Sequence, residues 1–313
     1  MNEAVSAFVV RINELFIEHD EVLRIWKKFD SLRLCNAGSK DDMGNRVHKG
    51  DPRHLFLMGL SGVGKTQIGE RYAERNPGYW LETEEEKIKI MPVIYVELPF
   101  PFTQLSFYTE ILRALGTENI RRDARINHIK ERVLMLLKKQ RVEMIIFDEM
   151  NFIMRTKRFD DQEAMEMLKD LTNKCQLSIV CMGTPKIEPL RKMEDEYIRR
   201  FGIDSIKKFE ECDESFCKLL TDIESHIGQK HKIKMGDPAT RLPQLLHRWS
   251  QGRIGYIHII LKESYRLLGV FEDGFNELEK AVLTVKVLNE AKFNLFGKND
   301  HLVQPKEGTN VAQ

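Results

Sequence analysis

The sequence predicts an α/β protein in which a parallel sheet is flanked by helices and followed by a helical C-terminal part. Between about His54 and Met182, short apolar runs alternate with longer segments of helical periodicity. Strands that alternate with helices pair in parallel through crossover connections. After about Phe209 only helical patterns follow. The chain is also long enough, at 313 residues, for one sizeable α/β core and a smaller helical lid.

Composition excludes several classes of protein. A hydrophobic share of 42% and a charged share of 31% are typical of a soluble globular chain, and the net charge of +1 indicates no partner. The five cysteines form no CxxC pair, which argues against a disulfide framework or a zinc site and favours a reducing, cytoplasmic compartment. No signal-peptide pattern and no apolar stretch of about 18 residues occur, so we expect no membrane partner.

Four regions are expected along the chain. They are an N-terminal helical segment and loop (1–52), an α/β core (53–210), a helical lid (211–296) and a flexible tail (297–313). The expected strands are 54–58, 93–97, 144–147 and 177–182. The expected helices are 65–75, 105–115, 125–140 and 162–174 in the core, and 213–227, 238–249, 254–268 and 275–293 in the lid.

The segment GLSGVGKT, Gly59 to Thr66, matches the phosphate-loop pattern G-x-x-x-x-G-K-[ST] between an expected strand and an expected helix. Glycine lets backbone N–H groups wrap phosphates closely, and the following helix directs its N-terminal dipole at the anion. Lys65 is placed to reach the β- and γ-phosphates, and the Thr66 hydroxyl to bind Mg²⁺. We therefore expect ATP and Mg²⁺ as cofactors. The expected nucleotide-binding residues are Gly59, Ser61, Gly62, Val63, Gly64, Lys65, Thr66 and Gln67.

The segment MIIFDE, Met144 to Glu149, is an apolar strand that ends in two carboxylates. Asp148 is placed to hold Mg²⁺, and Glu149 to polarise the attacking water. A strand that merely ends in an acidic turn is the alternative. The phosphate loop upstream in the same chain favours the catalytic interpretation.

Two further elements complete the expected site. Thr184 follows the apolar segment LSIVCMG and is a candidate to orient the water or contact the γ-phosphate; the alternative is a helix cap. Arg199 and Arg200, in IRRF, compete for the role of an arginine finger that acts on a neighbouring subunit. The alternative for this pair is a solvated helix end favoured by the helix dipole.

A phosphate loop, a strand ending in DE, a GTP turn and RRF in this order resemble the AAA+ ATPases, built on the ASCE type of P-loop sheet. More narrowly, the chain resembles transposition regulators of the TniB/TnsC type, through LPFPFTQLSFYTEILRALG, FDEMNFI, VCMGTP and SQGRIGYI. The resemblance implies an ATPase that forms a ring or helical filament of identical subunits on double-stranded DNA. It also implies that this assembly couples a TniQ-like target-selection protein to a DDE transposase.

One position departs from the pattern of related proteins. Many AAA+ lids carry a sensor arginine near the start of their third helix, but Gly255 occupies the place that aligns with it. Arg253 lies two residues earlier and is the remaining candidate for contact with the nucleotide.

DNA contact has some independent support. The segment from Arg121 to Arg141 contains eight Lys/Arg and two acidic residues, which suits contact with phosphates; the alternative is a solvated helical face. Candidate DNA-contacting residues in this segment are Arg121, Arg122 and Arg125, and the resemblance to transposition regulators adds Thr103 and Gln104, which follow the second expected strand. Two other functions remain open: a helicase loader or replication initiator, and a scaffold that binds nucleotide without turning it over.

Overall fold

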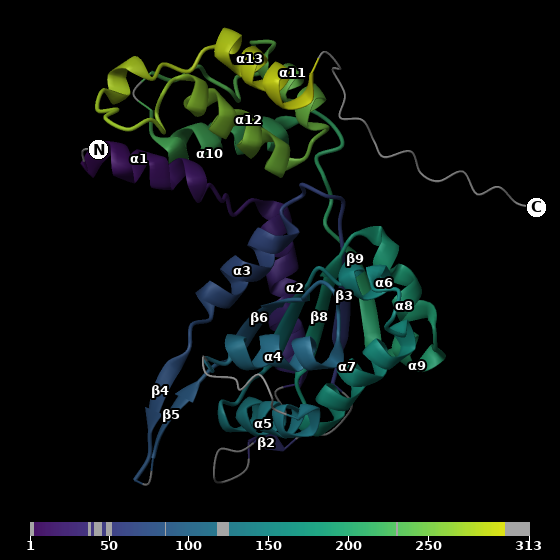
Figure 1. Cartoon of the computed structure of the whole chain (residues 1–313). Helices are drawn as coiled ribbons and strands as arrows, with labels where there is room; N and C mark the ends of the chain where they lie inside the picture. The colour runs from purple at the N-terminus through teal and green to yellow at the C-terminus, as the bar shows by residue number, and fades with distance from the viewer. Residues whose placement is uncertain are drawn as a thin grey trace, which may run out of the picture. The chain divides into compact units, whose positions relative to one another are not determined.

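The computed structural model describes residues 3–36, 39–40, 46–47, 52–84, 86–117, 125–229 and 231–297 (Figure 1). The chain divides into two compact units. Unit 1 combines residues 1–19, 62–64 and 207–313, and unit 2 combines residues 20–61 and 65–206. The phosphate loop therefore contributes its middle residues to unit 1 and its two ends to unit 2.

Unit 2 is built on a five-stranded parallel sheet. Its spatial order is β6–β7–β8–β3–β9, with every neighbouring pair parallel. The strands are β3 (His54–Met58), β6 (Val93–Glu97), β7 (Met144–Asp148), β8 (Ser178–Gly183) and β9 (Phe201–Ser205). The central strands β3, β7 and β8 are buried along their whole length, as parallel strands covered on both faces must be. The expected α/β fold with a parallel sheet is confirmed.

Helices cover both faces of this sheet. On one face α3 approaches so closely that a Cβ on Gly69 would lie 2.6 Å from Cε of Met182, and Trp26 of α2 donates a 3.0 Å hydrogen bond to the carbonyl of Ile68. The other face carries α4, α5 and α7 over one continuous apolar core. The helical segments of unit 2 are α2 (Asp20–Asn36), α3 (Lys65–Arg75), α4 (Gln104–Ala114), α5 (Ile126–Lys139), α6 (Asn151–Arg155), α7 (Asp161–Cys175), η1 (Pro185–Ile187), α8 (Glu188–Lys192) and α9 (Asp195–Arg200).

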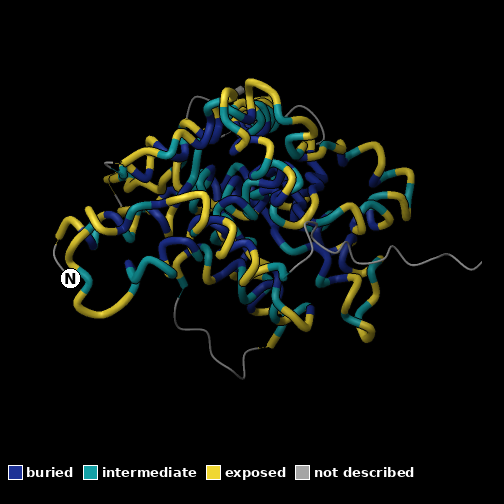
Figure 2. The backbone as a smooth tube through the Cα atoms, turned by 90° about the horizontal axis from the view of Figure 1, so that it is seen from above, coloured by how far each residue is buried: buried dark blue, intermediate teal, exposed yellow. Residues whose placement is uncertain are grey.

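Unit 1 is helical, with its own apolar core. The first helix joins this unit: Arg11 Nε donates to the carbonyl of Ile227 (3.1 Å), and His258 Nε2 lies 2.7 Å from the carbonyl of Ile12. Buried positions of the chain are shown in dark blue in Figure 2. The helical segments of unit 1 are α1 (Glu3–Asn13), α10 (Glu214–Ile227), α11 (Leu242–Ser250), α12 (Ile254–Leu267), η2 (Leu278–Lys280) and α13 (Val285–Phe296).

Three elements differ from the expectation. The strand β9 was not expected; only its first residue, Phe201, is buried, so it lacks the apolar run of the inner strands. The antiparallel pair β4 (Tyr79–Glu82) and β5 (Lys87–Ile90) was also not expected, because most of its residues are exposed. The expected helix 275–293 is wrong in its first half: α13 begins after Thr284, whose hydroxyl caps it by accepting from the Val287 N–H. The remaining short strands are β1 (Ser39–Lys40) and β2 (Arg46–Val47).

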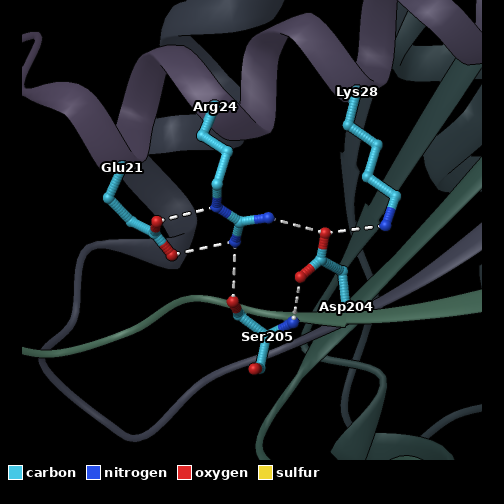
Figure 3. Close-up of polar contacts among 5 residues, drawn as sticks. All are labelled: Glu21, Arg24, Lys28, Asp204 and Ser205. Carbon is cyan, nitrogen blue, oxygen red and sulfur yellow. Dashed lines mark hydrogen bonds and ion pairs between the residues drawn. The ribbon is translucent and has the colours of Figure 1, made fainter.

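Besides its pairing with β3 and the buried Phe201, the edge strand β9 is held by charged side chains of α2 (Figure 3). Asp204 Oδ2 accepts from Arg24 Nη1 at 2.9 Å and from Lys28 Nζ at 2.7 Å. Arg24 also donates to the Ser205 carbonyl at 2.9 Å and pairs with Glu21. Partial burial raises the pKa of Asp204, but the hydrogen bonds from Arg24 and Lys28 outweigh it and lower that pKa to about 2. The carboxylate of Asp204 is therefore ionised in the folded protein at neutral pH.

The first residue of β3 is a buried neutral histidine. His54 is 1% exposed, its Nδ1 accepts from the Ile179 N–H at 3.1 Å, and its ring lies 4.7 Å from that of Phe201. Burial lowers the pKa of His54 to about 3, and the positive charge of Arg200 adds to the effect.

This histidine should make stability depend on pH. The unfolded chain protonates His54 near pH 6.5 and the folded chain only near 3, so stability is complete above pH 6.5 and is lost as pH falls toward 3. Between pH 7 and pH 5 the loss from this residue is about 2 kcal/mol. The His54→Asn variant keeps an acceptor for Ile179 and should lose that much less over the same interval in urea unfolding. Equal pH dependence of the two proteins would contradict this assignment.

Candidate nucleotide-binding site

The phosphate loop runs from the end of β3 to the start of α3. At its start the Gly59 N–H donates to the carbonyl of Gly183 at 3.0 Å, which ties the loop to the end of β8. Further along, Gly62 and Gly64 have φ of +83° and +95°, values that side chains with a Cβ rarely adopt. The backbone thus favours glycine at position 64, the second glycine of the motif, and also at position 62, which the motif leaves open.

Lys65 is the first residue of α3 and is nearly buried, at 9% exposure. Its ammonium donates to the carbonyls of Gly59 (2.9 Å) and Leu60 (3.1 Å), so the loop folds around it. Burial lowers the pKa of Lys65, while the charges of Asp148 and Glu149 oppose that shift. A cation in this place suits the phosphates of a nucleotide.

Asp148 ends β7 and is 1% exposed. Its Oδ2 accepts from the Thr66 hydroxyl at 2.6 Å and from the Tyr95 hydroxyl at 2.9 Å, and its Oδ1 accepts from the Glu149 N–H at 2.7 Å. The structure thus brings together Thr66 and Asp148, the two residues expected to hold Mg²⁺. Their hydroxyl and carboxylate oxygens are the ligand types that this ion prefers.

Tyr95 was not predicted to belong to the site. It lies in the middle of β6, in no motif, and reaches Asp148 because β6 and β7 are neighbours in the sheet. Burial, reinforced by the charge of Asp148, raises the pKa of Tyr95, so the phenol stays protonated and donates. The one signal available in the sequence was a tyrosine, with its polar hydroxyl, among the aliphatic residues of VIYVE.

Glu149 follows Asp148 in an unusual backbone conformation. Its φ is +55°, in the left-handed region that non-glycine residues seldom occupy. The next residue resumes regular bonding, since the Met150 N–H donates to the carbonyl of Met182 at 3.1 Å. Such outliers cluster at functional sites, where the surrounding structure imposes them.

Thr184 begins the turn after β8, and its side chain does not cap the helical turn that follows. Its hydroxyl instead donates to Asn151 Oδ1 at 2.7 Å, and its N–H donates to the same oxygen at 3.3 Å. Asn151, the first residue of α6, is 8% exposed and was not predicted from the sequence.

The two candidate arginine fingers differ in exposure. Arg200 has a side chain only 10% exposed, which donates to Asn173 Oδ1 at 2.7 Å and lies 3.3 Å from Glu196. Arg199 is exposed at the end of α9. Of the two side chains, that of Arg199 is the more exposed.

Arg253 and Gly255 lie in unit 1, as does Gly62. Arg253 donates to Gln251 Oε1 at 2.7 Å, and its guanidinium lies 5.3 Å from the centre of the Tyr256 ring. The Gly255 N–H donates to the carbonyl of Gly62 at 2.8 Å, and a Cβ on Gly255 would lie 2.8 Å from that oxygen. An arginine is therefore excluded at position 255, because backbone occupies its place.

The candidate DNA-contacting residues are only partly described. Thr103 is exposed and caps α4 by accepting from the Ser106 N–H at 3.1 Å, and the half-buried Gln104 begins that helix. Arg125 is exposed just before α5. Arg121 and Arg122 lie outside the described residues.

A parallel sheet in this order, with a phosphate loop after one inner strand and an Asp–Glu pair ending another, defines the AAA+ ATPase fold. Residues 40–211, more than half of the chain, match the model of the family described as "Bacterial TniB protein". The chain belongs to the TniB family, and the expected AAA+ class is confirmed. No curated protein sequence matches it.

Solved structures of similar fold include ORC and Cdc6 proteins. The Aeropyrum pernix ORC2 protein is 12% identical with a TM-score of 0.56, and the similarity covers 90% of this chain and 68% of that one. The A. pernix ORC1 protein in complex with DNA is 16% identical with a TM-score of 0.58, covering 88% and 64%. Cdc6p from Pyrobaculum aerophilum is 12% identical with a TM-score of 0.52, covering 87% and 79%. The chain thus spans about two thirds of the length of the two ORC proteins, and the likeness shows a shared fold.

Two other kinds of feature are missing from the described ranges. They contain no group of three or more His, Cys, Asp or Glu side chains arranged to hold a metal ion. None of their helices combines the length and apolarity that crossing a bilayer requires.

The contact between Gly255 and Gly62 can be tested directly. Gly255→Ala should destabilise the protein by about 1–3 kcal/mol, because its Cβ meets a backbone oxygen that cannot move aside cheaply. It should also weaken nucleotide binding, since Gly62 belongs to the phosphate loop. The matched control is Gly202→Ala, whose Cβ would be 3.6 Å from its nearest neighbour. Equal melting temperatures and nucleotide affinities of the two variants would contradict the contact.

Proposed function

We propose that the chain is an ATP-dependent DNA-binding regulator of transposition that hydrolyses ATP with Mg²⁺. It assembles as a homo-oligomer, a ring or helical filament, on duplex DNA. There it couples a TniQ-like target-selection protein to a DDE transposase in the cytoplasm. Membership of the TniB family supports this proposal. The observation that carries the ATPase part is the convergence of Lys65, Thr66 and Asp148 at one edge of the sheet.

The residues divide the chemistry among them. Lys65 binds the β- and γ-phosphates, while Thr66 and Asp148 supply oxygen ligands for Mg²⁺. Mg²⁺, when bound, neutralises charge on the phosphates. Tyr95 holds Asp148 in place by donating to its Oδ2. Glu149 polarises the attacking water as general base.

Assembly supplies the remaining groups. Arg199 from a neighbouring subunit completes the site as an arginine finger, so that ATP binding stabilises the oligomer and hydrolysis releases it. Thr103, Gln104, Arg121, Arg122 and Arg125 contact the DNA. Contacts of this kind address phosphates and carry little sequence preference. Arg253 is retained as a candidate for nucleotide contact.

A helicase loader or replication initiator is the second candidate. It is favoured by the fold shared with ORC and Cdc6 proteins, one of which was solved in complex with DNA. Co-purification with a replicative helicase, and not with a DDE transposase, would select this function.

Two variants at the site separate binding from hydrolysis. Lys65→Ala should abolish ATP binding and ATP-dependent DNA binding. Glu149→Gln should slow phosphate release by about 100-fold or more, because it removes the general base, yet retain ATP-dependent DNA binding. The surface variant Lys174→Ala serves as the matched lysine control. Gel shifts that show the same DNA affinity with ATP, with ADP and for Lys65→Ala would contradict ATP-dependent assembly on DNA.

Mixing of subunits tests the arginine finger. Arg199→Ala and Lys65→Ala should each be inactive alone, yet a mixture should regain part of the ATPase rate, because some sites then combine an intact phosphate loop with an intact Arg199. Arg200→Ala should lower the melting temperature through loss of its contacts with Asn173 and Glu196. An Arg199→Ala protein that hydrolyses ATP at the wild-type rate would remove Arg199 from the mechanism.

A further inference from the structure

Asn151 occupies a place that the motifs do not explain. It lies two residues after Glu149, at the start of α6, and is 8% exposed. Both hydrogen bonds of its Oδ1 come from Thr184, one from the backbone N–H at 3.3 Å and one from the hydroxyl at 2.7 Å.

These two donors determine which way the Asn151 amide points. A backbone N–H can only donate, so the atom facing Thr184 must be the carbonyl oxygen and not the NH₂ group. The Nδ2 end therefore points away from Thr184, and it donates to no acceptor among the described residues. Nδ2 is also not among the buried side-chain atoms that lack both a hydrogen-bond partner and contact with solvent. Asn151 thus presents a fixed, accessible pair of N–H donors.

The same hydrogen bonds use up the donor of Thr184. Its hydroxyl has one proton, which is given to Asn151 Oδ1 at 2.7 Å. Phosphate oxygens are acceptors only, so a residue that contacts them must donate. Thr184 in this arrangement keeps acceptor capacity but has no proton left for a phosphate.

The end of β8 places this amide at the edge where the phosphate loop begins. The Gly183 carbonyl accepts from the Gly59 N–H at 3.0 Å, and Thr184 follows directly. A Cβ on Gly183 would lie 2.8 Å from Ile187 and 3.4 Å from Asn151 Nδ2. The lack of a side chain at 183 keeps this approach open.

We propose that Asn151, rather than Thr184, contacts the terminal phosphate of ATP, and that Thr184 is its positioning residue. This inference rests on the proposed ATP site and reassigns one role within it. Asn151 donates to the γ-phosphate through Nδ2, while Thr184 fixes the orientation of the amide by donating to its Oδ1. ADP lacks the γ-phosphate that Asn151 contacts, so Asn151 favours the binding of ATP over ADP.

The test compares equilibrium affinities for Mg-ATP and Mg-ADP in the full chain carrying Glu149→Gln, so that ATP persists. Asn151→Ala should weaken ATP binding by about 10- to 100-fold, the worth of one charge-assisted hydrogen bond, and change ADP binding by no more than about twofold. Asn151→Asp keeps acceptors for Thr184 but has no donor, and should lose at least as much. Thr184→Ser should behave as wild type, and Thr184→Val should lose less than Asn151→Ala. Asn127→Ala, an exposed asparagine of α5, is the matched control.

The outcomes separate the possibilities. Unchanged ATP-to-ADP selectivity in both Asn151 variants overturns the inference, as does a selectivity loss confined to Thr184→Val. Equal weakening of ATP and ADP assigns Asn151 a purely structural role and also overturns it. ADP affinity doubles as the folding check, because it reports on the same site. If the parent protein binds neither nucleotide, the proposed function itself fails, and this inference fails with it.

Discussion

The carboxyl edge of the parallel sheet is the constraint on which the rest of the structure depends. Parallel strands end at one edge, so Gly59, Asp148 and Gly183 meet there although they are far apart in sequence. The hydrogen bond of 2.6 Å from Thr66 to Asp148 then joins the start of α3 to the end of β7. It requires α3 to lie close on the sheet, which Gly69 permits because no side chain separates the helix from Met182. The geometry of the candidate site therefore depends on the close packing of α3 against the sheet.

Elements that bury an apolar face in the core are the ones that sequence predicts well. The strands β3 and β6 and the helix α3 have the bounds expected from their apolar patterns, since burial demands those residues. The strand β9 escapes this logic because α2 holds it through Asp204, a polar contact between segments far apart in sequence. The pair β4 and β5 escapes it as well. It is joined by an ion pair between Glu82 and Lys87, and its Trp80 is exposed, so its sequence lacks the apolar alternation that predicts a strand.

The site shows the same division. Lys65, Thr66 and Asp148 belong to local motifs whose geometry travels with the segment, so sequence alone identifies them. Tyr95 reaches Asp148 only because β6 and β7 are paired, and Asn151 of α6 is contacted by Thr184 from the turn after β8. Neither contact can be read from the spacing of residues in the sequence. Exposure, likewise a property of the fold, distinguishes Arg199 from Arg200. The glycine at 255 becomes intelligible only once the carbonyl of Gly62 is seen to occupy the space.

The two carboxylates at the end of β7, Asp148 and the following Glu149, are held in opposite ways, and this contrast fits the different tasks that we propose for them. Asp148 is buried and accepts three hydrogen bonds, which fix its orientation, as the proposed role of a metal ligand requires. Glu149 is less buried and sits on a strained backbone, so its position is imposed by its neighbours. Negative charge also accumulates nearby: burial, followed by the charges of Asp148, Glu74 and Glu97, raises the pKa of Glu70. A divalent cation beside Asp148 would relieve that repulsion, so cation binding and nucleotide binding should favour one another at this edge of the sheet.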